Sequence, residues 1–89
     1  SPLIHAIEGG HRNLVQAILV KGGRTDIKVK GTSPLMLAAF LGDAGIVKVL
    51  IENGADPKEK DVKGHTPLHY AMAKKNREAA AVIVKALKG

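Results

Sequence analysis

Gly64-His65-Thr66-Pro67-Leu68-His69-Tyr70-Ala71 is the stretch that decides the fold, because its centre recurs twice earlier in the chain. Thr66-Pro67-Leu68 returns as Ser33-Pro34-Leu35 and as Ser1-Pro2-Leu3, so the three prolines are 32 and 33 residues apart. A fixed period of this length is the signature of a repeat protein, in which similar units stack on their neighbours. The chain is therefore expected to consist of about three units of about 33 residues.

Each unit contains two short apolar segments separated by a polar break, which predicts two helices per unit. Ser33 and Thr66 each precede a proline, and a hydroxyl residue there can accept a hydrogen bond from a free backbone N–H at a helix start. Gly22 and Gly54 follow second segments, where a helix needs a left-handed residue to stop. The second segments are apolar around most of their circumference: 14–19, 46–51 and 79–84.

Helices this short are marginal alone, because nucleating a helix costs more than a few hydrogen bonds return, so neighbouring units must cover one another. The sequence predicts one all-α repeat domain, an α-solenoid over residues 1–89, with units at about 1–27, 28–60 and 61–89. The first unit lacks a projecting segment before its proline motif, and we expect further units upstream. Five of its apolar residues are expected to have an uncovered side: Leu3, Ala6, Ile7, Leu14 and Ile18.

The stretch 64–71 resembles the ankyrin signature G-x-T-P-L-H-x-A, and residues 31–39 and 47–56 are similar to the family's continuation. The resemblance covers nearly the whole chain. It implies stacked helix–turn–helix units with short β-hairpin-like fingers between them, and a concave face, made of finger tips and first helices, that binds proteins. In the family, the signature histidine holds a tight turn by hydrogen bonds. Here Ile4 and Met36 replace it in the first two units, so only His69 is expected to have that structural role.

Composition points to a small helical core in a reducing compartment. Apolar residues make up 45% of the chain but aromatic residues only 2%, so Ala, Leu, Ile and Val must form the core, with Tyr70 packed inside. The chain has no cysteine for a disulfide or thiolate zinc site, and no apolar run reaches the roughly 18 residues of a membrane span. We expect an intracellular protein, cytoplasmic or nuclear. Its formal charge of +6 would attract an acidic partner or would serve solubility alone, so charge by itself does not choose the partner.

Catalytic and metal-binding patterns are missing from the sequence, so neither an enzyme nor a cofactor is predicted. The chain has no nucleophile elbow, phosphate-binding glycine loop or paired-carboxylate arrangement. His65 and His69 are four residues apart, but Pro67 opens a helix between them, so they do not share a helical face as zinc ligands do. The other two histidines have a single acidic residue between them, which is too little for a four-ligand site.

The family resemblance places a set of surface positions on the concave face. The finger positions are Val29, Lys30, Thr32, Val62, Lys63 and His65. The first-helix positions are Glu8, Gly9, Phe40, Leu41, Ala73 and Lys74. Phe40 beside Leu41 is the sharpest feature, because an exposed aromatic residue next to a leucine is a candidate anchor for a partner. The alternative is that Phe40 packs on the next unit's first helix, near Ala73.

Protein binding at the concave face is the leading hypothesis for function. Phe40 and Leu41 form its apolar anchor, and Lys30, Lys63 and Lys74 surround them with charges that suit an acidic protein surface. One alternative is a structural spacer within a longer repeat array. Another is weak binding of an anionic polymer or lipid through the lysine-rich surface, although the scarcity of aromatic residues and of Lys/Arg runs disfavours nucleic acid. The pattern does not specify an oligomeric state.

Overall fold

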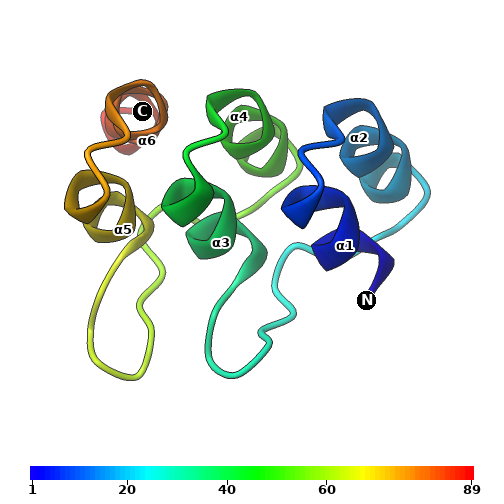
Figure 1. Cartoon of the computed structure of the whole chain (residues 1–89), viewed down its shortest axis with the longest axis horizontal. Coiled ribbons are helices and arrows are strands. Elements are labelled where there is room, and N and C mark those ends of the chain that lie inside the picture. Colours follow the sequence, from blue (N-terminus) through cyan, green and yellow to red (C-terminus); the bar gives the residue numbers. More distant parts are fainter.

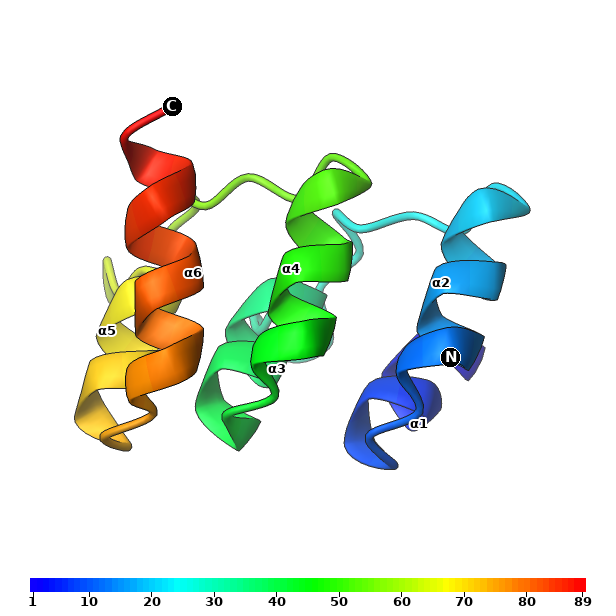
Figure 2. The ribbon, with the colours of Figure 1, turned by 90° about the horizontal axis from the view of Figure 1, so that it is seen from above.

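Six helices form three successive pairs in the computed structural model, which describes all of residues 1–89. The pairs are α1 (Pro2–Glu8) with α2 (Arg12–Val20), α3 (Pro34–Leu41) with α4 (Ala44–Glu52), and α5 (Pro67–Ala73) with α6 (Arg77–Leu87). One layer contains α1, α3 and α5 and the other contains α2, α4 and α6 (Figure 1), and the helices of each layer lie side by side (Figure 2). There is no β-strand, and the predicted all-α repeat fold is confirmed.

The starts of the first helices follow from the hydroxyl residue before each proline. The Ser33 hydroxyl accepts a hydrogen bond from the Met36 N–H at 3.1 Å, and the Thr66 hydroxyl accepts one from the His69 N–H at 3.3 Å. Both predicted caps are confirmed. A third cap was not predicted: the Asp43 carboxylate accepts from the Ile46 N–H at 3.0 Å and starts α4.

Two of the second helices end as the glycine pattern predicts. Gly22 and Gly54 follow α2 and α4 with φ of +99° and +102°, in the left-handed region that residues with a side chain rarely adopt. The α6 helix is followed in the same way by Gly89, with φ of +89°, and is 11 residues long, against 9 residues each for α2 and α4. Gly89 comes 35 residues after Gly54, rather than one period of 33, which agrees with a last helix two residues longer.

The core is continuous through the three pairs and is built mainly from aliphatic side chains and alanine. It is deepest in the middle pair, which has a neighbour on each side, and its fully buried members there include Leu35, Ala38, Ile46 and Leu50. The expected uncovered side in the first pair is wrong for Leu3, Ala6 and Ile7, which are buried because α2 and α3 pack on α1. Of the same five residues, Leu14 is half exposed and Ile18 is partly buried.

Two fingers, the segments joining α2 to α3 and α4 to α5, project to the same side beyond the layer of first helices (Figure 1). In the first finger, Val29 and Thr32 exchange two backbone hydrogen bonds of 2.9 and 3.0 Å around Lys30 and Gly31. These central residues have φ of +54° and +81°, as a two-residue hairpin turn with the right twist requires. The predicted hairpin-like character is thus limited to one bridge in this finger.

The second finger is closed by backbone hydrogen bonds from the Asp61 N–H to the His65 carbonyl at 2.9 Å and from the Gly64 N–H to the Asp61 carbonyl at 3.0 Å, and also by the Asp61 side chain. One oxygen of the Asp61 carboxylate accepts hydrogen bonds from the backbone N–H groups of Lys63 and His65, both at 2.9 Å. The other oxygen accepts the hydroxyl hydrogen bond of Tyr70 on α5. Asp61 therefore folds the finger tip and also ties it to the helix that follows.

Asn76 links the third pair to the second. Its side-chain N–H₂ donates to the backbone carbonyls of Ala39 at 2.8 Å and Phe40 at 3.0 Å, which are at the end of α3. This contact fixes the backbone that carries Phe40. None of the six helices has the length and apolar character needed to cross a membrane.

Candidate functional site

A shallow hollow of about 460 Å³ lies between the two finger tips and the facing surfaces of α3 and α5, and we call it the finger hollow. Its lining combines three lysines, two histidines and two larger aromatic rings. The lining residues are Lys30, Gly31, Thr32, Phe40, Asp61, Val62, Lys63, His65, His69, Tyr70, Ala73 and Lys74.

The structure brings together eight of the twelve predicted concave-face positions in this hollow. Val29 and Leu41 do not line it, although their side chains are half exposed. Glu8 and Gly9, at the end of α1, also lie outside it. Successive residues of a helix point in different directions, which is consistent with Phe40 lining the hollow while Leu41 lies outside it.

Phe40 is 44% exposed, and its ring shares the hollow with Ala73 of the next first helix. The ammonium of Lys74 lies over the ring, 5.0 Å from its centroid, which is within the range of a cation–π contact. The ring therefore lies beside Lys74 at the end of α5, and a large part of it remains accessible.

The charge of the hollow is positive at its surface. Lys30, Lys63 and Lys74 are exposed, and Asp61 is the one acidic residue among the lining residues. The Asp61 side chain is only 8% exposed, and both of its oxygens accept the internal hydrogen bonds of the second finger. Because that carboxylate is occupied, the three ammonium groups face the solvent without a matching anion.

The Tyr70 hydroxyl holds the pKa of the Asp61 carboxyl below its ordinary value, with further help from the N–H groups of His65 and Lys63. The same hydrogen bond raises the pKa of Tyr70, because its hydroxyl must keep its proton to donate. Tyr70 is partly buried against the core, and its polar end reaches the hollow. The expectation that it packs inside is correct for its position on the core but omits this hydrogen bond.

His69 does not have the predicted hydrogen-bonding role. Its ring makes no hydrogen bond and is exposed, and it stacks on the ring of His65 with centroids 3.9 Å apart and planes 15° apart. Both imidazoles meet Tyr70 edge-on, at 6.1 and 5.6 Å. The physical reason is that the carboxylate of Asp61, rather than the histidine, satisfies the N–H groups of the turn.

Four of the lining residues are not among the predicted partner-binding positions: Gly31, Asp61, His69 and Tyr70. The four-residue spacing of His65 and His69 was the available signal, but it predicted no shared helical face, because Pro67 opens a helix between them. In the structure, no three His, Asp or Glu side chains are arranged to hold a metal ion. The stacked rings instead add a flat, partly apolar wall to the hollow.

Comparison with known proteins agrees with the repeat architecture. A family model described as "Ankyrin repeats (3 copies)" matches residues 3–88. "Neurogenic locus notch homolog protein 1" of Danio rerio is 38% identical over 85 residues, which cover 92% of this chain and 4% of that protein. The human protein of the same name is 36% identical over 88 residues, which cover 96% of this chain and 3% of that protein.

A relative with a different name shares the same region. "B-cell lymphoma 3 protein homolog" of Mus musculus is 36% identical over 76 residues, or 84% of this chain and 17% of that protein. The chain thus spans less than a fifth of each of these relatives, and their other segments have no counterpart in it. Ankyrin repeats are generally non-enzymatic modules for protein interaction. From the match over residues 3–88, the chain belongs to the ankyrin repeat family.

Proposed function

We propose that this chain binds a protein partner in the finger hollow and that the contacting segment of the partner is acidic. The exposed part of Phe40 is the apolar anchor, and Lys30, Lys63 and Lys74 receive carboxylates around it. The observation that carries the proposal is a half-exposed aromatic ring inside a hollow whose free charges are all positive.

Phe40 has the properties of an interface anchor. Its backbone is fixed by the two hydrogen bonds from Asn76, and its ring adjoins Ala73 and Lys74, so little conformational freedom is lost on binding. Large aromatic residues in such positions dominate the energy of many interfaces, and truncating one costs about 2 kcal/mol or more. The flat wall made by His65 and His69 offers further contact area beside it.

The lysines act differently from Phe40. Exposed charges at the rim of an interface mainly raise the association rate, while the buried anchor determines how long the complex lasts. Lys74 has both roles in the proposal, because its ammonium lies over the Phe40 ring and next to the space that a partner carboxylate would occupy. Binding should therefore weaken moderately with salt, without disappearing.

The test is quantitative capture of partners from a cell lysate with the wild-type chain and with Phe40→Ala, followed by Kd measurement on each purified partner. Phe40→Ala should weaken the specific complex by about 30-fold, the equivalent of about 2 kcal/mol. Val20→Ala is the matched control, because Val20 is 68% exposed but lies outside the hollow. Circular dichroism and melting temperature establish that both variants fold.

Two other outcomes would replace the proposal. If no ligand distinguishes wild type from Phe40→Ala while the fold is intact, the chain serves as a structural spacer within a larger array. If the bound ligand is heparin or an anionic vesicle, affinity should fall steeply with salt and ignore Phe40→Ala, and the chain then binds anions through its general positive charge.

A further inference from the structure

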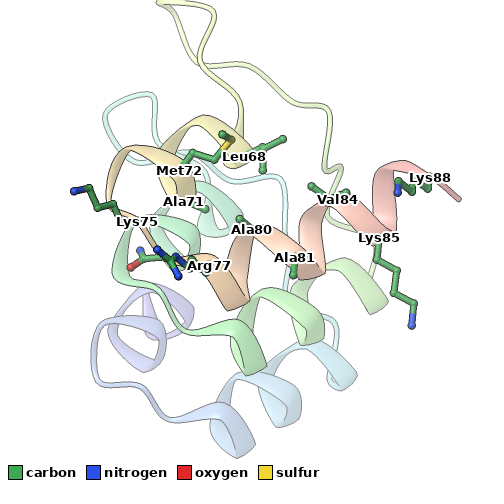
Figure 3. A pocket seen from close by; sticks show the side chains of 11 residues that line it. Leu68, Ala71, Met72, Lys75, Arg77, Ala80, Ala81, Val84, Lys85 and Lys88 are labelled. Carbon is green, nitrogen blue, oxygen red and sulfur yellow. The ribbon is translucent and has the colours of Figure 1, made fainter.

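A second surface, on the outer side of the third helix pair, is separate from the finger hollow. It is a groove of about 720 Å³ between α5 and α6, and we call it the outer groove. Its floor consists of Leu68, Ala71 and Met72 from α5 and Ala80, Ala81 and Val84 from α6. Figure 3 shows these side chains along the two helices, with basic residues toward both ends of α6.

The floor is suited to packing against a helix, because the equivalent surface of the second pair, on α3 and α4, packs against α5 and α6. Leu35, Ala38 and Val47 precede Leu68, Ala71 and Ala80 by one repeat period of 33 residues. All three are fully buried, where α3 and α4 meet α5 and α6. In the third pair Ala71 is fully buried as well, but within residues 1–89 no further helix packs on the floor, and Met72 there is 64% exposed.

The rim of the outer groove differs from that buried surface in charge. Lys75 and Arg77 lie near the start of α6, and Lys85 and Lys88 lie near its end. No acidic residue lines the groove. The α6 helix has 11 residues, so the two basic pairs are separated by about 16 Å along the helix axis. A complementary helix therefore needs acidic residues about three turns apart and an apolar stripe between them.

The position of Lys75 also changes the way in which a partner can dock. The residue one period earlier is Gly42, and a Cβ added there would lie 2.7 Å from the Asn76 side chain. The third pair can therefore pack closely on the second because Gly42 has no side chain. Lys75 has a side chain at this place, with φ of +59°. A helix pair stacked here as α5 and α6 stack on α3 and α4 would meet the Lys75 side chain, whereas a single helix across the floor need not.

A second copy of the chain is poorly matched to this groove. Two hollows at the opposite end of the stack are lined by residues such as His5, His11 and Arg12, and neither has an acidic lining residue. End-to-end stacking would therefore bring no carboxylate from these hollows to the basic rim of the groove. Charge complementarity favours an acidic partner over self-association.

We propose that the outer groove binds an amphipathic α-helix of another protein, with an apolar face of small and aliphatic residues and acidic residues at both ends. The apolar face covers Met72, Ala80 and Val84, and the acidic ends pair with the two basic clusters. This site does not depend on the proposed function of the finger hollow.

The experiment uses a fluorescein-labelled peptide of about 18 residues, long enough to cover the 11 residues of α6 with a turn beyond either end. It has Leu and Ala at i, i+3, i+4 and i+7, and Glu in its first and last turns. A second peptide has Lys in place of every Glu. Fluorescence anisotropy with the whole chain should give at least about tenfold tighter binding of the Glu peptide.

Variants then locate the binding surface. Met72→Glu and the double change Lys85→Glu with Lys88→Glu should each weaken the Glu peptide by about tenfold or more, since both sites are exposed and tolerate substitution. Lys48→Glu, at another exposed lysine, on α4, is the charge control, and Phe40→Ala is the control for the finger hollow. Both controls should change Kd less than about twofold.

Three results would overturn the proposal. The first is that the Glu and Lys peptides bind alike, or that neither binds. The second is that Lys48→Glu weakens binding as much as the groove variants do. The third is another occupant: either sedimentation equilibrium shows a dimer that Met72→Glu abolishes, or phosphatidylserine vesicles bind the groove while the Glu peptide does not.

Discussion

Gly42 and Asn76 are in such close contact that a Cβ on Gly42 would lie 2.7 Å from Cγ of Asn76. Asn76 cannot move away without cost, because its side chain donates hydrogen bonds to the carbonyls of Ala39 and Phe40 at the end of α3. Gly42 also has φ of +81°, which already disfavours a side chain. One glycine therefore ends α3 and admits the link between the second and third helix pairs.

Gly42→Ala should destabilise the chain more than Gly64→Ala does. Both glycines have φ of +81°, but a Cβ on Gly64 meets no atom within 4 Å. Gly64→Ala thus costs only the left-handed conformation, about 1 kcal/mol. Gly42→Ala also disturbs Asn76 and should cost at least about 1 kcal/mol more. Urea denaturation of both variants measures the difference. Equal free energies of unfolding would mean that Asn76 moves aside at no cost.

Three hydroxyl residues before the prolines should differ in their contribution to stability. Ser33 is fully buried and its hydroxyl caps α3, so Ser33→Ala leaves the Met36 N–H unpaired and should cost about 1–2 kcal/mol. The Thr66 bond is longer, at 3.3 Å, and more exposed, so Thr66→Ala should cost less. Ser1 makes no side-chain cap, and Ser1→Ala should be neutral. Thermal melts of the three variants would contradict this order if Ser1→Ala matched Ser33→Ala.

The fold could be predicted from the sequence because its signals are local. A cap before a proline, a glycine after a helix and an apolar segment between them each act within a few residues. Their repetition at a constant period then specifies stacking, since short amphipathic helices have no other way to bury their apolar faces. The burial of Leu3 and Ile7 was not predicted, because it depends on how closely α3 packs against α1 and not on a local signal.

The site was harder to predict because its contacts join residues far apart in the sequence. Asn76 contacts the end of α3 from 36 and 37 residues away, and nothing in its local sequence marks that bond. The exposure of Phe40 depends on where Ala73 and Lys74 of the next unit lie. The resemblance grouped finger and first-helix positions on one face, but only the packed structure shows that Leu41 does not line the hollow and that the two histidines stack.

The hydrogen bond between Tyr70 and Asp61 should make stability depend on pH at both ends of the range. The folded pKa of Asp61 is lowered, so its contribution is complete above the ordinary value of about 3.9 and is lost as pH falls through the folded pKa. The folded pKa of Tyr70 is raised, so its contribution is complete below about pH 10 and is lost as pH rises further.

With Asp61→Asn, the melting temperature should therefore fall less as the pH is lowered. With Tyr70→Phe, it should fall less as the pH is raised, and also somewhat less as the pH is lowered. Melting temperatures of wild type and both variants, measured from about pH 3 to pH 11, check this. If Tyr70→Phe leaves both limbs of the profile unchanged, the hydrogen bond does not contribute to stability. The wild-type profile alone is insufficient, because other groups also titrate.

Two lysines with left-handed backbone should respond alike in stability but differently in binding. Lys30 in the first finger and Lys75 between α5 and α6 have φ of +54° and +59°, which costs a residue with a side chain about 1–2 kcal/mol. Lys30→Gly and Lys75→Gly should each raise the free energy of unfolding by about 0.5–1 kcal/mol, since glycine relieves that strain but loses more entropy on folding. Urea denaturation measures this common effect.

The same two variants separate the two proposed binding surfaces. Lys30 lines the finger hollow and Lys75 lines the outer groove. Lys30→Gly should weaken the partner captured through Phe40 by about threefold or more and leave the Glu peptide unaffected, and Lys75→Gly should do the reverse. Because both variants are expected to be more stable than wild type, weaker binding cannot be attributed to unfolding. If each variant weakens both ligands equally, the two surfaces are not independent, and the charges act through the overall field of the chain.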